Sequence, residues 1–198
     1  MSARCCTRSR KPAAKPKARP QTPQIVWRDS RSIGLPYAGR LENGVQLPAF
    51  GKDFVTANPL GSGYNPAFRR WGSERLVRLI LRVTAQYHRL HPKAPRVVIG
   101  DMSLQHGGPF VGYGGLGHKS HQNGLDVDIP YPRKDGAERE PQSVSDIDMK
   151  RAQDLVDLWV RAGAQFVFVG PNTGLTGPAG IVQTLVYHDD HMHVRLPG

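Results

Sequence analysis

The chain has little cysteine, few aromatic residues and no long apolar run. Its only cysteines among 198 residues are Cys5 and Cys6, and aromatic residues make up 8% of the sequence. Because both cysteines lie near the N-terminus, the rest of the chain has neither a disulfide framework nor thiolate ligands for a metal. No segment approaches the roughly 18 consecutive apolar residues of a membrane-spanning helix. The fold is therefore expected to depend on an apolar core, and any metal on nitrogen and oxygen ligands.

Acidic residues are outnumbered, but only one part of the chain is strongly basic. The sequence has 27 basic and 16 acidic side chains, which gives a formal net charge of +11. Residues 1–24 hold seven of the basic side chains and none of the acidic ones, so the remainder carries 20 basic and 16 acidic side chains. A segment of this composition is predicted to be a disordered tail suited to contact with polyanions. Residues 25–198 are predicted to form one domain, without the charge of a specific nucleic-acid-binding module.

Two segments have the apolar spacing of helices. Ser73 is the expected N-cap of the first helix, and Pro92 lies beyond its end. The second helix is predicted to begin with a capping box formed by Ser145 and Asp148 and to stop at Gly163. The apolar faces consist of Leu76, Leu79, Ile80, Val83 and Tyr87 in the first helix, and of Ala152, Leu155, Val156 and Trp159 in the second.

Four short segments are predicted to be strands. Residues 96–99 and 166–169 are largely continuous apolar runs, which are typical of buried strands. Residues 125–129 and 191–196 alternate, so each would place its polar side chains on one face and its apolar side chains on the other. Residues 24–71 are rich in glycine, proline and asparagine and are expected to form loops with short strands.

Five of the eight histidines lie in two short clusters, at residues 118–128 and 188–193. Histidine is the commonest protein ligand for first-row metals. Pairing of the two alternating strands would bring His121, Asp128 and His193 together. Two imidazoles and one carboxylate, with a fourth position open, form the ligand set of a hydrolytic zinc site. Zinc bound there would lower the pKa of its water from about 15.7 to about 7 and so activate that water for hydrolysis.

The remaining residues of the two clusters are expected to act around this metal. His191 shares a strand face with His193 and is placed to serve as a general base or to stabilise a developing oxyanion. His188 and His118 are candidates for contacts with substrate or with the metal ligands, and Asp126 for orienting a ligand imidazole through its free ring N–H. A glycine-rich loop over residues 107–117 is expected to border the site.

These motifs resemble those of the penicillin-insensitive murein endopeptidase family, which belongs to the LAS group of metallopeptidases. The group pattern is a histidine, six residues, an aspartate, and a later His-x-His; here it is formed by His121, Asp128 and the pair His191 and His193. The resemblance extends more weakly over residues 60–196. The segments that carry it are Gly100–Ser103, Gly107–Pro109, Gly117–Ile129 and His191–Leu196.

The resemblance implies the fold, the reaction and the roles of the site residues. The implied fold is α+β, with a small antiparallel sheet that carries the zinc site and is flanked by helices and long loops. The implied reaction is hydrolysis of the D-alanyl-diamino acid cross-links of peptidoglycan by a metal-activated water. The implied roles are one zinc ion per chain held by His121, Asp128 and His193, catalysis by His191, and places in the active site for His118 and His188, of which His188 is predicted to take part in catalysis.

Two other functions are compatible with the same residues. A carboxypeptidase or dipeptidase of the same group would remove a terminal D-alanine. A non-catalytic protein would bind the cell wall or another polyanion and use the metal for structure only. The substrate indicates a periplasmic or extracellular location, although no apolar signal segment follows the basic N-terminus.

Overall fold

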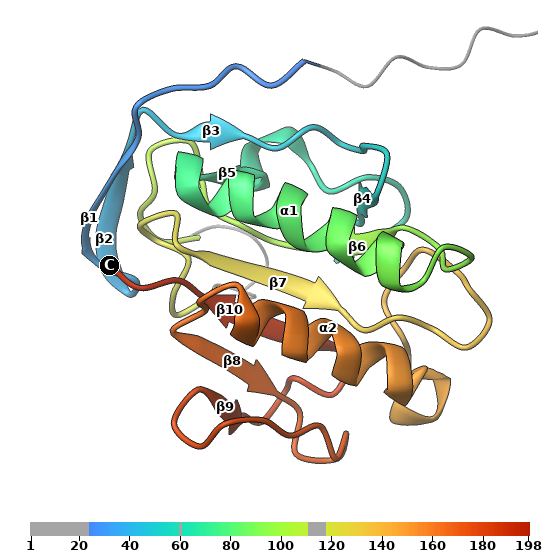
Figure 1. The fold of residues 1–198 in the computed structure, drawn as a ribbon. Coiled ribbons are helices and arrows are strands. Elements are labelled where there is room, and N and C mark those ends of the chain that lie inside the picture. The colour runs from blue at the N-terminus through green and yellow to red at the C-terminus, as the bar shows by residue number, and fades with distance from the viewer. Residues whose placement is uncertain (1–23, 60, 111–117) are drawn as a thin grey trace, which may run out of the picture.

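The computed structural model describes residues 24–59, 61–110 and 118–198. Two helices, α1 (Glu74–Leu90) and α2 (Met149–Arg161), pack side by side over one face of a four-stranded sheet (Figure 1). The described part of the chain is thus α+β, as the family resemblance implies. No helix in this part is both long and apolar enough to span a membrane.

The two segments in which polar and apolar residues alternate, 125–129 and 191–196, form neighbouring strands of the four-stranded sheet. Its strands are β7 (Asp126–Pro130), β8 (Phe166–Val169), β9 (Val182–Thr184) and β10 (His191–Arg195), in the order β7-β10-β8-β9. Strand β10 is antiparallel to both neighbours, as predicted, whereas β9 runs parallel to β8 and was not predicted. A parallel neighbour needs a crossover of about a dozen residues, and residues 170–181 supply it.

The other strands form three two-stranded sheets around this unit. Strands β1 and β2 form an antiparallel hairpin, β3 pairs antiparallel with β5, and β4 pairs parallel with β6. The predicted loops over residues 24–71 therefore contain more strand than turn signals suggested. The bounds are Arg31–Leu35 for β1, Ala38–Glu42 for β2, Val45–Gln46 for β3, Phe54–Thr56 for β4, Trp71–Gly72 for β5 and Val97–Ile99 for β6.

Helix α1 begins where the sequence predicts. The Ser73 side chain accepts a hydrogen bond from the Leu76 amide at 3.2 Å, which satisfies one of the free N–H groups of the first turn. Leu76, Ile80 and Val83 are fully buried against the core.

Replacing Ser73 with alanine is expected to destabilise the protein by about 1 kcal/mol, because the first turn of α1 loses its cap. Urea unfolding followed by circular dichroism measures this change. Ser62→Ala, in an exposed bend, is the matched control and should leave the unfolding midpoint unchanged. An equal effect of both substitutions would contradict the capping role.

Helix α2 begins differently from the prediction. Its N-cap is Asp148, whose side chain accepts a hydrogen bond from the Arg151 amide at 3.1 Å. Ser145 belongs instead to the 3-10 turn η2 (Val144–Asp146), and its hydroxyl lies 2.7 Å from that of Ser143. The predicted capping box is therefore wrong, because the serine is engaged within the preceding turn.

The sheet separates an apolar side from a polar side. Val127 and Ile129 on β7, with Met192 and Val194 on β10, are fully buried and pack in one cluster with the inner faces of both helices. The polar residues that alternate with them along both strands face the other side of the sheet. The side away from the helices is therefore where the site lies.

Two predictions fall on residues outside the described ranges. Residues 1–23, with Cys5 and Cys6, are not described, so the basic tail and the domain boundary after residue 24 remain predictions. Most of the glycine-rich loop over residues 107–117 is also outside.

Candidate metal centre

The pairing of β7 with β10 places the two clusters of the sequence opposite each other. His193 is the register partner of Asp128, and Arg195 is the partner of Asp126. His191 is opposite Pro130, one strand repeat further along the same face. Residues more than 60 positions apart in the sequence thus share one face.

His121 has the geometry of a metal ligand. Its Nδ1 donates a hydrogen bond to the Met102 carbonyl oxygen at 2.6 Å, which leaves a lone pair on Nε2. Nε2 is buried, makes no hydrogen bond, and lies 3.3 Å from Asp128 Oδ1. The backbone of His121 is left-handed, with a φ of 68°, a conformation that costs energy for a residue with a side chain. An unsatisfied buried nitrogen in a strained segment suits coordination of a cation.

His193 also directs one ring nitrogen to Asp128. The His193 Nδ1 atom lies 3.0 Å from Asp128 Oδ1. The other nitrogen, Nε2, donates to Asp126 Oδ1 at 2.7 Å, and the same oxygen accepts from Arg195 Nε at 2.7 Å. Asp126 therefore fixes the orientation of the ring, which is the arrangement of a metal-ligating histidine held by a carboxylate.

His118 is a third histidine beside Asp128. Its Nδ1 lies 3.5 Å from Asp128 Oδ2, and its Nε2 donates to Asp101 Oδ2 at 2.8 Å. The side chains of His118, His121 and Asp128 can each offer a ligand atom within 4.8 Å of the other two. The predicted set contains His193 in place of His118. Because both His118 and His193 contact the Asp128 carboxylate, measurement of metal binding by a variant of each histidine identifies the third ligand.

The distances between these atoms are close to those between the ligands of a tetrahedral metal ion. Zinc bonds to nitrogen and oxygen of about 2.0–2.2 Å in tetrahedral geometry correspond to ligand atoms about 3.3–3.6 Å apart. Asp128 Oδ1 lies 3.3 Å from His121 Nε2 and 3.0 Å from His193 Nδ1. The His121 distance falls in this range and the His193 distance is slightly shorter, so these nitrogen and oxygen donors lie close enough together to hold a metal ion.

The carboxylates of the site are ionised. Burial by itself would raise the pKa of Asp128, but His121, His193 and His191 outweigh it and hold that pKa well below the usual range. The pKa of Asp126 is lowered for the same reason, although burial opposes the change. Two buried negative charges on one face need a compensating positive charge. The histidines provide it when they are protonated, and a metal ion would provide it when bound.

Asp101 supports the site, although no sequence pattern assigned it a role. Only Gly100 separates it from the end of β6, and its carbonyl oxygen accepts from the Asp128 amide at 2.8 Å. Its side chain binds that of His118, accepts from Arg69 Nε at 2.6 Å and accepts from Asn65 at 2.9 Å. The aspartate is almost fully buried. Its signal in the sequence is its place in the family-like segment Gly100–Ser103, close after a buried strand.

His191 and His188 lie beside the cluster in different environments. His191 Nδ1 donates to Asp190 Oδ1 at 2.6 Å, and Nε2 lies 3.8 Å from Asp128 Oδ1. Burial would lower the pKa of His191, but Asp190 and Asp128 raise it to about 9. His188 Nδ1 donates to the Val186 carbonyl oxygen at 2.8 Å, and burial lowers the pKa of His188. The two rings are 4.7 Å apart, so the site holds one imidazole that favours its proton and one that does not.

Two comparisons match this chain to one named group of proteins. A model of the family described as penicillin-insensitive murein endopeptidase matches residues 32–164, well over half of the chain. The matched range contains His118, His121, Asp126 and Asp128, and it ends before β8 and β10.

Curated relatives carry the same name. The penicillin-insensitive murein endopeptidase of Escherichia coli O157:H7 (strain EC4115 / EHEC) is 33% identical over 154 residues, which cover 65% of this chain and 54% of the relative. That of Yersinia pestis bv. Antiqua (strain Antiqua) is 32% identical over the same coverage. That of Klebsiella pneumoniae subsp. pneumoniae is 46% identical over 61 residues, 31% of this chain and 20% of the relative. The chain spans about half the length of the first two relatives.

Proposed function

The chain belongs to the penicillin-insensitive murein endopeptidase family, and from that premise we propose that it is a zinc-dependent endopeptidase of peptidoglycan. The proposed bond is the D-alanyl-diamino acid link that joins neighbouring stem peptides. The proposed fold is that of the LAS metallopeptidases, and the proposed location is periplasmic or extracellular because the polymer is outside the cytoplasm.

The proposed ligands of one zinc ion are His121, Asp128 and His193. When bound, zinc supplies a Lewis acid that polarises a carbonyl group and lowers the pKa of a water molecule. The residues around it keep the ligands in place: the Met102 carbonyl oxygen fixes the ring of His121, and Asp126 fixes the ring of His193. Each of these partners accepts the remaining ring N–H, so each ligand nitrogen keeps its lone pair for the metal.

His191 and His188 are proposed to handle the protons of the reaction. With Nδ1 bonded to Asp190, His191 can hold a proton on Nε2 and donate it to the oxyanion or to the leaving amine. With Nδ1 bonded to Val186, neutral His188 presents Nε2 as an acceptor, which suits removal of a proton from the attacking water. His118 is proposed to contact substrate while Asp101 holds its ring.

One observation carries the proposal. The buried Nε2 of His121 makes no hydrogen bond and points at the same carboxylate oxygen that His193 Nδ1 approaches from another strand. A structural hydrogen-bond network would pair this nitrogen, since a buried unpaired polar atom costs about 1–3 kcal/mol. Coordination of a cation explains why it is left without a hydrogen-bond partner.

The test is digestion of purified cross-linked peptidoglycan with and without EDTA, with the products identified by mass. Conversion of dimeric muropeptides to uncross-linked monomers, abolished by EDTA and restored by zinc, is the expected result. Loss of a terminal alanine alone would instead assign a carboxypeptidase or dipeptidase. Bound zinc with no cleavage at all would favour a non-catalytic wall-binding protein.

A further inference from the structure

Two aromatic rings continue the metal-binding face of the sheet beyond His193. Phe168 on β8 is the register partner of His193, and directly opposed residues of neighbouring strands point to the same face. The ring centroid of Phe168 lies 5.7 Å from that of His193 and 5.5 Å from that of Phe166, two positions earlier on β8. Val167 and Val169, which alternate with these rings, are fully buried on the helix side. Both phenylalanines are partly exposed, so their rings are open to solvent beside the metal centre.

Three exposed apolar residues follow β9 and lead into the site. Leu185, Val186 and Tyr187 are 40%, 60% and 92% exposed. The Leu185 amide donates to the Val169 carbonyl oxygen at 2.8 Å, which keeps the start of this segment beside β8. Its end is held at the site, because His188 Nδ1 donates to the Val186 carbonyl oxygen at 2.8 Å. We call five residues of these two segments the apolar platform: Phe166, Phe168, Leu185, Val186 and Tyr187.

Tyr187 has a backbone conformation that the packing of its own side chain does not explain. Its φ is 64°, in the left-handed region, which costs energy for a residue with a side chain. Burial of the ring does not offset this cost, because the residue is 92% exposed. Glycine would adopt the same conformation without strain. A strained and exposed aromatic residue directly before His188 therefore favours contact with a ligand of the site.

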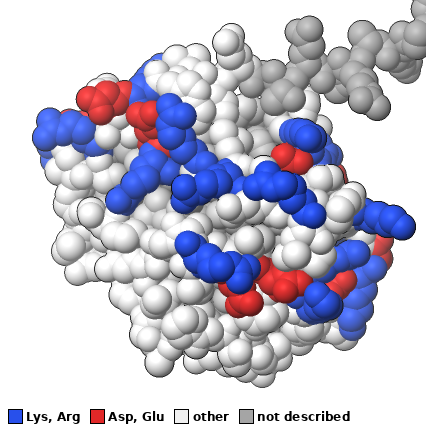
Figure 2. All heavy atoms as spheres, in the orientation of Figure 1, with Lys and Arg blue, Asp and Glu red and all other residues white. Residues whose placement is uncertain are grey.

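The platform belongs to a part of the chain that carries no charge. Between Arg161 and Asp189 the sequence contains no Lys, Arg, Asp or Glu. Figure 2 shows charged side chains over the helices, whereas the lower end of this view, where Figure 1 places β8 and β9, is white. The metal centre, by contrast, is bordered by Asp126 and Asp190. A ligand that spans both regions would place polar groups at the metal and an uncharged part on the platform.

We propose that the apolar platform binds the glycan strand of peptidoglycan while the scissile peptide bond lies at the metal, an inference that rests on the proposed peptidase function. The glycan is a chain of uncharged N-acetylated sugars, whereas the stem peptides carry carboxylate and ammonium groups. A surface without charges would desolvate such a group and offer it no partner. The apolar faces of sugar rings can instead pack on aromatic rings and aliphatic side chains, while the sugar hydroxyls stay hydrated.

The dimensions of the sheet agree with this division of the substrate. Neighbouring strands are about 4.8 Å apart, so β8 and β9 lie about 5 and 10 Å from the strand that carries His193. An extended peptide of three or four residues spans about 10–14 Å. A stem peptide whose scissile end lies at the metal can therefore bring its sugar to the outer strands of the sheet.

The test is an NMR titration of the full chain with a tetrasaccharide of N-acetylglucosamine, which contains no stem peptide. Tyr187→Gly should weaken binding by roughly two- to tenfold, the fold-change that corresponds to an aromatic contact of about 0.5–1.5 kcal/mol. This variant should stay folded, because glycine adopts the left-handed conformation readily. Tyr187→Phe keeps the ring and should bind as the parent does.

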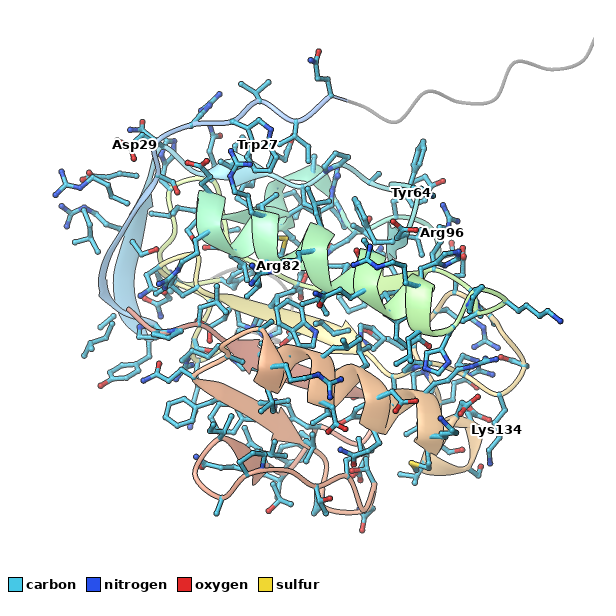
Figure 3. All side chains as sticks on the ribbon, viewed as in Figure 1. Trp27, Asp29, Tyr64, Arg82, Arg96 and Lys134 are labelled. Atoms are coloured by element: carbon cyan, nitrogen blue, oxygen red, sulfur yellow. The ribbon has the colours of Figure 1, made fainter. Side chains whose placement is uncertain are left out.

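The matched control is Trp27→Ala, which removes an aromatic side chain remote from the platform. Figure 3 shows Trp27 beside α1, at the opposite end of the molecule from β8 and β9. Its ring lies 4.0 Å from the guanidinium carbon of Arg78. Its removal should leave binding of the tetrasaccharide unchanged.

A kinetic comparison separates contact with the glycan from contact with the peptide. Two soluble muropeptide dimers are compared as substrates, one that bears its disaccharides and one from which the sugars have been removed. Tyr187→Gly should raise KM for the sugar-bearing dimer more than for the sugar-free dimer, with little change in kcat.

Several outcomes overturn the proposal. They are absence of tetrasaccharide binding by the parent chain, equal effects of Tyr187→Gly and Trp27→Ala, and loss of binding in Tyr187→Phe. An equal rise of KM for both dimers would assign the platform to the stem peptide, and a fall in kcat alone would reduce Tyr187 to a residue that positions His188. Tetrasaccharide binding that depends on Tyr187, without cleavage of either dimer, would contradict the peptidase function and still support the platform.

Discussion

Replacing His121 with alanine is expected to abolish both zinc binding and cross-link cleavage. Its Nε2 atom is the buried, unpaired nitrogen beside Asp128, so the substitution removes one protein ligand outright. Zinc affinity should fall by more than about 100-fold, since loss of an outer partner of a ligand alone costs about 10–100-fold. Zinc content of the purified protein, measured by mass spectrometry, and release of muropeptide monomers are the two readouts.

The control for this substitution is His106→Ala, which changes an exposed histidine outside the cluster. It should retain zinc and activity. Circular dichroism separates ligand loss from unfolding, since the strained backbone at His121 could relax in the variant. Retention of zinc and full activity by His121→Ala would remove this residue from the ligand set.

The same assay decides the third ligand. Because Asp126 holds the ring of His193 with Nδ1 directed at Asp128, His193→Ala should behave like His121→Ala. His118→Ala should keep zinc and lower turnover only. The opposite pair of results would place His118 in the ligand set, as the close grouping of its ring with His121 and Asp128 also permits.

Replacing His191 with alanine is expected to leave zinc bound and to lower kcat by about 10²–10⁴, the usual contribution of a positioned acid or base. Its Nε2 lies 3.8 Å from Asp128 Oδ1, further than the nitrogens of His121 and His193, so the ion keeps its ligands. Steady-state kinetics on a purified dimeric muropeptide should show a change in kcat with little change in KM.

A variant of Asp190 tests how His191 works. Asp190→Asn removes the carboxylate that accepts from Nδ1 and should lower the pKa of His191, because the negative charge beside the ring is lost. The limb of the pH–rate profile that reports this group should shift to lower pH. Loss of zinc in His191→Ala would reassign His191 as a ligand, and an unchanged kcat would exclude a role in proton transfer.

The helices and the central strands could be predicted from the sequence because local rules decide them. The spacing of apolar residues and the Ser73 cap define α1, and continuous or alternating apolar runs define β8 and β10. The start of α2 was predicted wrongly at Ser145, since competing side-chain contacts in the preceding turn are not visible in a pattern. Strand β9 was missed because three residues that pair parallel at an edge leave little periodic signal.

Part of the site could also be predicted, and part could not. Histidine clusters with metal-ligand spacing on period-two segments indicate a metal through residue type and spacing alone. The roles of Asp101, Arg69 and Asp190 could not be predicted, because each is a single polar residue outside a repeating pattern. Its partner is either far away in the sequence or is decided by the direction of the side chain. The left-handed backbone of His121 could not be predicted either, because residues with a side chain rarely adopt this conformation.

Residue types and their periods were enough to predict which side chains could bind a metal and which faces of α1, β7 and β10 are apolar, and to show that residues 25–198 contain no cysteine. The packing of the chain was needed to establish that Asp128 meets His121, His193 and His118 at once. The physical reason is that strand register and helix packing set distances between residues far apart in the chain, and no local pattern encodes those distances.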